Sequence, residues 1–125
     1  MEIKEHFMDK EQYLVGSGKK EWIFLHHTAG WDNPMGTIDG WNRDTRGKIA
    51  TEFVLGGQSI IKKKDHHYDG IIAQAFPSGN YGWHLGTGNS LMHRNSVGIE
   101  VCNFGQVVKG KNYVNIPVPE EQTVK

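Results

Sequence analysis

Alternating apolar and polar positions along this chain predict a series of short strands separated by loops. A continuous apolar run over residues 21–27 is typical of a central strand, because both faces of such a strand are buried. The Gly56-Gly57 pair is typical of a hairpin turn between two strands. Strands are predicted over residues 21–27, 49–55, 58–62, 71–76 and 97–103.

Helical signals are fewer and shorter. Residues 37–44 predict a short helix that starts at a Thr cap, with Ile38 and Trp41 spaced one helical turn apart. Gly40 weakens this helix, and the preceding Asn33-Pro34 pair is interpreted as a loop breaker. Residues 87–94 predict a loop with a helical turn, and residues 106–116 an extended hairpin. Strands interleaved with short helices predict an α/β fold, a mixed central β-sheet flanked by helices.

Length and local composition predict a single domain. Residues 1–20 are expected to form a polar N-terminal leader with a flexible joint at 16–20, and residues 21–125 the domain itself. The polar stretch at 120–123 is typical of a helix start, yet the sequence ends at Lys125. We therefore expect the domain to be incomplete at its C-terminus, with its last helix missing.

Charge and cysteine content exclude several classes of function. Fourteen basic and fourteen acidic residues give no net charge, which argues against a nucleic-acid partner. The N-terminus lacks the apolar core of a signal peptide, and no stretch is long enough to span a membrane. The single cysteine, Cys102, excludes an internal disulfide. We expect a monomer that is cytoplasmic as synthesised.

Two histidines close the first central strand, and two later segments carry further candidate chemistry. Imidazole is a good zinc ligand, and a catalytic zinc has three protein ligands and one open position. Neighbouring strand residues point to opposite faces, so His26 and His27 cannot serve equally. The later segments are Trp-His-Leu-Gly over residues 83–86 and Ser-Val-Gly-Ile-Glu over residues 96–100. Alternation in the second of these places Glu100 on the face opposite Ile99.

In this order, His-His-Thr-Ala-Gly (26–30) and the two later segments closely resemble the zinc-dependent N-acetylmuramoyl-L-alanine amidases. These enzymes belong to the phage lysozyme and peptidoglycan recognition protein superfamily, and the resemblance runs from about residue 22 to residue 105. It implies a peptidoglycan hydrolase that uses a zinc-activated water. The bond cleaved would be the amide between N-acetylmuramic acid and L-alanine of the stem peptide. The substrate would be peptidoglycan or a muropeptide. The lack of a signal peptide fits a phage endolysin that acts on the cell wall after release, or a cytoplasmic recycling or toxin-like enzyme, better than a secreted one.

The resemblance also implies roles for individual residues. His26 corresponds to the first zinc ligand, Glu100 to the general base, and His84 to a cleft residue that contacts substrate or stabilises the transition state. A paired rim carboxylate is the alternative for Glu100. The family's other two ligands, a histidine and a cysteine or aspartate, follow the last strand, and no histidine here follows His93. The chain alone is thus expected to lack a complete zinc site, unless His84 or His93 substitutes.

Other positions are assigned more loosely. Glu52 stands in a strand where the family often has other residues, and it could supply a second carboxylate to the cleft or lie on the surface. Trp31 is the better aromatic candidate for contacting glycan or peptide. Asn95 is placed among the substrate-binding residues, in a loop that it helps to fix. His66-His67 is interpreted as solvated surface.

Two other functions remain as alternatives. Some members of the superfamily keep the groove and only recognise muropeptides, so a non-catalytic peptidoglycan-binding module is the main rival. A general metalloprotease is disfavoured because the sequence contains no His-Glu-x-x-His segment.

Overall fold

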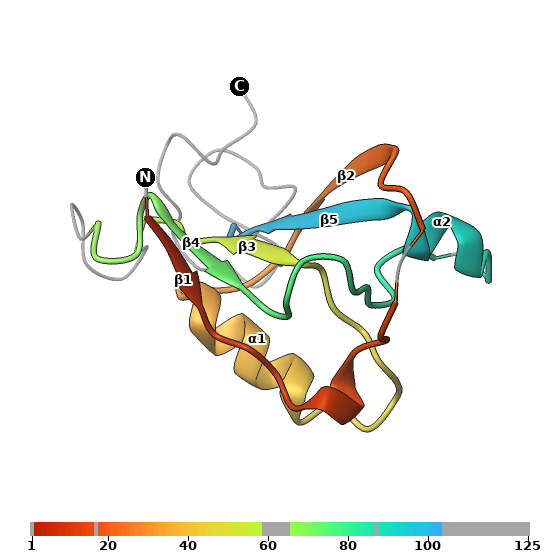
Figure 1. Ribbon diagram of the computed structural model, residues 1–125. Helices are drawn as coiled ribbons and strands as arrows, with labels where there is room; N and C mark the ends of the chain where they lie inside the picture. Colours follow the sequence, from red (N-terminus) through yellow and green to blue (C-terminus); the bar gives the residue numbers. More distant parts are fainter. Residues whose placement is uncertain (1, 17, 59–65, 87, 104–125) are drawn as a thin grey trace.

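A five-stranded mixed sheet forms the centre of the fold (Figure 1). The computed structural model describes residues 2–16, 18–58, 66–86 and 88–103. The strands stand in the order β1-β4-β3-β5-β2, and β3 and β4 are antiparallel while the other three neighbouring pairs are parallel. Their bounds are β1 Glu2–Glu5, β2 Trp22–His27, β3 Phe53–Leu55, β4 Ile71–Gln74 and β5 Ser96–Val101. The predicted α/β fold around a mixed sheet is confirmed.

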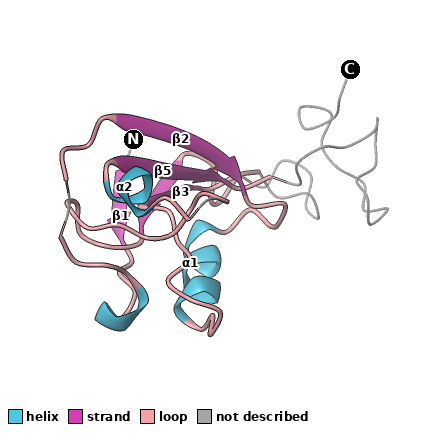
Figure 2. Cartoon of the chain, turned by 90° about the vertical axis from the view of Figure 1, so that its right-hand side faces the viewer, coloured by secondary structure: helices cyan, strands magenta, loops and turns pink. Residues whose placement is uncertain are grey.

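The helices accompany this sheet. Helix α1 (Pro34–Asn42) packs against β3 and β4, and the short α2 (Ser90–Arg94) leads directly into β5 (Figures 1 and 2). A 3₁₀ turn, η1, covers Lys10–Gln12. Among the described residues, no helix is long and apolar enough to cross a membrane.

Helix α1 begins three residues earlier than the sequence predicts. The Asn33 side chain accepts a hydrogen bond from the Gly36 amide at 3.1 Å, so Asn33 rather than Thr37 is the N-cap. Pro34 then occupies the first turn, where its missing N–H is not needed. The Asn-Pro pair, interpreted as a loop breaker, is therefore a helix start.

The strand predicted over residues 49–55 is shorter in the structure, because only Phe53–Leu55 forms β3. Upstream of it, Ile49 makes an isolated bridge with Trp83. The antiparallel neighbour of β3 is β4. The hairpin partner predicted at 58–62 falls almost entirely outside the described residues, as do the predicted hairpin at 106–116 and the helix start at 120–123.

The expected polar leader is wrong for the described part of residues 1–20. Strand β1 pairs in parallel with β4, and Met8 and Tyr13 are buried in the core. The Tyr13 ring stacks on Phe76 with centroids 5.5 Å apart. Two apolar side chains in a mostly polar stretch gave no periodic signal, yet they anchor this segment.

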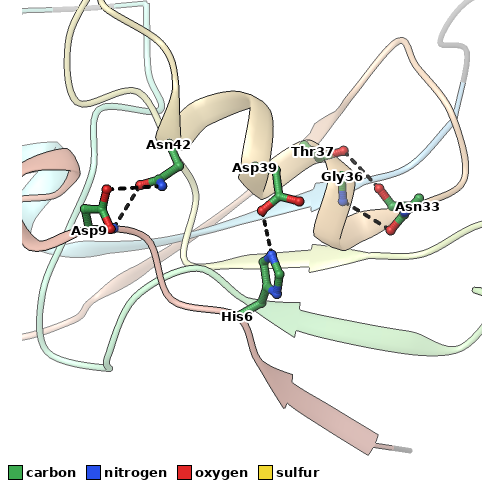
Figure 3. A network of polar contacts seen from close by, with 7 residues as sticks. All are labelled: His6, Asp9, Asn33, Gly36, Thr37, Asp39 and Asn42. Carbon is green, nitrogen blue, oxygen red and sulfur yellow. Dashed lines mark hydrogen bonds and ion pairs between the residues drawn. The ribbon is translucent and has the colours of Figure 1, made fainter.

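Polar contacts fix the same segment to α1 (Figure 3). The His6 ring lies 2.7 Å from the Asp39 carboxylate, and the Asp9 amide donates to the Asn42 side chain at 2.8 Å. The N-terminal segment is therefore joined both to the edge of the sheet and to its helix.

The two faces of the sheet differ in burial. Val54 and Ala73 face α1 and are fully buried, together with Ile38 of the helix. On β2, by contrast, Ile23 and Leu25 are 70% and 73% exposed. Within the described part of the chain, the face of β2 that carries Ile23 and Leu25 is exposed to solvent.

Candidate functional site

The site is built where β2 lies beside β5. In their parallel register His26 is paired with Glu100, so both side chains leave the same face of the sheet at neighbouring positions. His27 points to the other face and is exposed. The structure therefore places His26, rather than His27, on the face of Glu100, and the role of His26 as a zinc ligand stays a prediction.

A cavity of about 760 Å³ opens on this face. Glu100 and the imidazoles of His84 and His93 give it polar groups, and two tryptophans with aliphatic side chains give it apolar walls. Its lining comprises Trp41, Ile49, Ala50, Thr51, Trp83, His84, Leu85, Gly88, Ser90, His93 and Glu100. Apolar walls with few polar groups are typical of a binding site for a mid-sized ligand.

His84 lies over β5 and is held on three sides. Its Nδ1 is 3.0 Å from Nε2 of His26, and its Nε2 is 2.8 Å from the Ser96 hydroxyl. Its backbone amide donates to Nδ1 of His93 at 3.1 Å. The ring fits there because Gly98 has no side chain. His84 is thus fixed against His26, at the wall of the cavity.

Burial controls the charge of the His84 and His26 imidazoles. It lowers the pKa of His84 to about 4, with the neighbouring His26, His93 and Lys20 adding to the effect. Burial, and then His27, also lower the pKa of His26. Both imidazoles are therefore neutral near pH 7, the form in which histidine binds metals.

The pKa of Glu100 shifts in the opposite direction from those of the two histidines. Burial raises the pKa of its carboxyl, because the charged form loses solvation. A carboxylate with a raised pKa binds a proton more readily, which suits a general base. The role of general base that the sequence predicts for Glu100 stays a prediction.

Lys20 is a residue of the site region that the sequence analysis missed. Its ammonium donates to the carbonyls of Asn80 at 3.1 Å, Arg94 at 2.8 Å and Ser96 at 3.2 Å. These carbonyls belong to the loop before His84, the end of α2 and the start of β5. Lys20, the last residue of the predicted flexible joint, therefore ties these three segments together. Carbonyl partners that come together only in three dimensions leave no signal in the sequence.

The structure does not bring Glu52 into the cavity. Its side chain is buried, at 4% exposure, and accepts hydrogen bonds from Ser78 at 2.5 Å and from Gln74 at 3.3 Å. The expectation that Glu52 shares a cleft with Glu100 is therefore contradicted, and so is its alternative as a surface carboxylate. A buried carboxylate satisfied by two neutral donors is a structural group.

Trp31 and Asn95 also lie outside the cavity lining. The Asn95 carbonyl accepts from the Glu21 amide at 2.8 Å, and its side chain packs against Gly18, so it fixes the entry to β2. The tryptophans that do line the cavity are Trp41 and Trp83. Substrate contacts by Trp31 and Asn95 stay predictions.

The described residues provide only part of the zinc site that the sequence predicts. They contain no group of three His, Cys, Asp or Glu side chains placed to hold a metal ion. His26 offers one imidazole, with Glu100 beside it. The described residues by themselves therefore do not make a complete zinc site, and zinc binding stays a prediction.

Solved structures share this fold. The structure of PlyL superposes with a TM-score of 0.64 at 17% sequence identity, covering 82% of this chain and 58% of that one. The PlyG catalytic domain gives a TM-score of 0.62 at 18% identity, with 82% and 56% covered. A mutant endolysin from Bacillus subtilis gives 0.60 at 21% identity, with 82% and 61% covered.

This chain thus covers less than two thirds of each of these structures, and at such identities the likeness establishes the fold alone. No family model matches the sequence, and no curated protein matches it either.

Proposed function

We propose that this protein is a peptidoglycan hydrolase that cleaves the amide between N-acetylmuramic acid and L-alanine of the stem peptide. The observation that carries the proposal is the pairing of His26 with Glu100 beside a cavity whose wall contains His84. The fold shared with an endolysin and with the PlyG catalytic domain supports it. So do the ordered motifs around these three residues.

In this reaction Glu100 acts as the general base. Its carboxylate takes a proton from the attacking water, the carbonyl carbon gains the hydroxyl oxygen, and the carbon–nitrogen bond breaks. Glu100 then gives the proton to the departing amine of alanine, which balances the hydrolysis. The apolar walls around Trp41 and Trp83 hold the substrate and exclude bulk water.

Zinc is part of the proposal, with His26 as the ligand that this chain provides. When bound, it would polarise the scissile carbonyl and lower the pKa of a water molecule. The remaining ligands would come from residues outside the described part of the chain. We also propose that the protein is a monomer, that it is made in the cytoplasm, and that it acts on the cell wall after release.

The test is to incubate the purified protein, produced as its whole gene encodes it, with and without added zinc, with cell-wall sacculi. Mass spectrometry of the released peptides then identifies new amino-terminal alanine, the product that separates this amidase from a glycosidase or an endopeptidase. We expect such peptides from the wild type and none from His26→Ala or Glu100→Gln.

A second candidate function is muropeptide recognition without hydrolysis. It is favoured by the absence of a three-ligand metal group among the described residues. Binding of muropeptides by a chain that releases no amino-terminal alanine with zinc present would support this candidate and contradict the amidase.

A further inference from the structure

Ser96 is the first residue of β5, and its side chain faces the same way as those of Gly98 and Glu100. It is buried, at 3% exposure, and does not line the cavity. A hydroxyl in such a position must satisfy both its proton and its lone pairs within the protein. The partners that it has determine how His84 is held.

The Ser96 hydroxyl has a single proton, which it donates in a hydrogen bond to a carbonyl oxygen. Its oxygen lies 2.6 Å from the carbonyl oxygen of Met92, which can only accept. In the 2.8 Å hydrogen bond between Ser96 and His84, Nε2 of the imidazole must then be the donor and the Ser96 oxygen the acceptor. His84 therefore carries its proton on Nε2.

We infer that Ser96 is a positioning residue whose hydroxyl fixes the tautomer and the ring orientation of His84, and through His84 the orientation of His26. Because Nε2 of His84 is the donor to Ser96, its Nδ1 presents a lone pair. The 3.0 Å contact with His26 is then a hydrogen bond donated by Nε2 of His26. The lone pair of His26 is consequently on Nδ1.

This arrangement gives His84 the role of orienting His26, which differs from the substrate contact that the sequence suggests. Both of its ring nitrogens are engaged inside the protein, and the ring rests on the backbone at Gly98. The consequence for catalysis rests on the proposed hydrolase function, whereas the tautomers of the two histidines do not.

The experiment measures these tautomers directly in the metal-free protein. Long-range ¹⁵N–¹H correlation spectra at about pH 8, where imidazoles are neutral, report which ring nitrogen carries the proton. His84→Gln assigns the signals. The wild type is expected to show the Nε2–H form at both His84 and His26. An Nδ1–H form at His84 in the wild type would overturn the inference, whatever the variants do.

Variants of Ser96 test cause and effect. Ser96→Ala should shift His84 away from the pure Nε2–H form, and Ser96→Thr, which keeps the hydroxyl, should retain it. Ser78→Ala is the matched control, because it removes the hydroxyl of an exposed serine that donates a hydrogen bond to Glu52 outside the cavity. An unchanged His84 signal in Ser96→Ala would contradict the role of Ser96.

The same variants separate this inference from the proposed function. If the wild type releases amino-terminal alanine from sacculi, Ser96→Ala should lower kcat by about 10–100-fold, with KM nearly unchanged. A wild type that shows the expected tautomers but hydrolyses nothing would refute the hydrolase and leave the Ser96 inference standing. A Ser96→Ala protein with the wild-type kcat would contradict the link from Ser96 to catalysis.

Discussion

His84 rests on Gly98: a Cβ atom built on this glycine would lie 2.9 Å from Nδ1 of the imidazole. The same Cβ would lie 2.9 Å from Cγ2 of Thr51, a fully buried neighbour. Glycine thus gives the ring its place in the narrow space between β5 and the residues that precede β3. In the sequence Gly98 looks like an ordinary strand residue. In the structure it leaves the space in which the His84 ring lies.

Gly98→Ala should therefore displace His84 from His26. Overpacking of this kind costs about 1–3 kcal/mol, so urea unfolding should show a loss of that size. The hydrolysis of sacculi should fall with it, because the orientation of His26 depends on His84. The measurements are the free energy of unfolding and the release of amino-terminal alanine.

Gly40→Ala is the matched control for this substitution. Gly40 lies in α1, and nothing stands within 4 Å of a Cβ placed there. The change should stabilise the protein by about 0.5–1 kcal/mol through helix propensity and leave hydrolysis unaltered. Equal effects of the two substitutions would contradict the close contact at Gly98.

Glu100→Gln should separate catalysis from stability. Loss of the general base should lower the rate of hydrolysis about 10²–10⁴-fold. Burial raises the pKa of Glu100, so the folded wild type loses stability as the pH rises through that pKa. The neutral glutamine avoids this loss, and the metal-free variant should be at least as stable as the wild type at pH 7.

Below the ordinary pKa of a glutamate the two proteins should unfold alike, since both side chains are then uncharged. Glu11→Gln, an exposed change in η1, should leave activity at the wild-type level. A Glu100→Gln protein that unfolds more easily at pH 7 than the wild type would show that its ionised carboxylate is stabilising.

Cys102 should be unreactive in the folded protein. It is 4% exposed, and burial raises the pKa of its thiol to about 11. Because the thiolate is the reactive form, iodoacetamide at about pH 8 should label it about 100-fold more slowly than free cysteine. Mass spectrometry detects the single adduct, and labelling in urea should proceed at the ordinary rate. Rapid labelling of the native chain would mean that this end of β5 opens readily.

Met8→Ala should show how far the N-terminal segment belongs to the folded unit. Met8 is 5% exposed in the core, and truncating such a side chain costs about 2–5 kcal/mol. Val15→Ala, at a position that is 77% exposed, should change stability by no more than about 0.5 kcal/mol. Two variants of equal stability would restore the picture of a dispensable leader.

Local patterns determined the parts of this protein that depend on neighbours in sequence. The apolar run before His26 specified β2, and the alternation around Ile99 specified β5 and the face on which Glu100 lies. These features follow from the two-residue period of a strand, which needs no knowledge of what lies across the sheet. The chemistry was suggested by the resemblance of the ordered motifs at 26–30, 83–86 and 96–100 to a family of amidases.

Only the tertiary structure decided which of these residues meet. The sequence offers both Glu52 and Glu100 as carboxylates of the cleft, yet Ser78 and Gln74 hold Glu52 away from the cavity. Lys20 donates hydrogen bonds to three carbonyls that are distant in the sequence. His84 contacts Ser96 and Gly98, which lie on a different element. Such contacts depend on strand order and register, which arise when the whole sheet assembles. The pattern of the chain therefore provides the side chains of the site, and the packing of the sheet decides which of them act together.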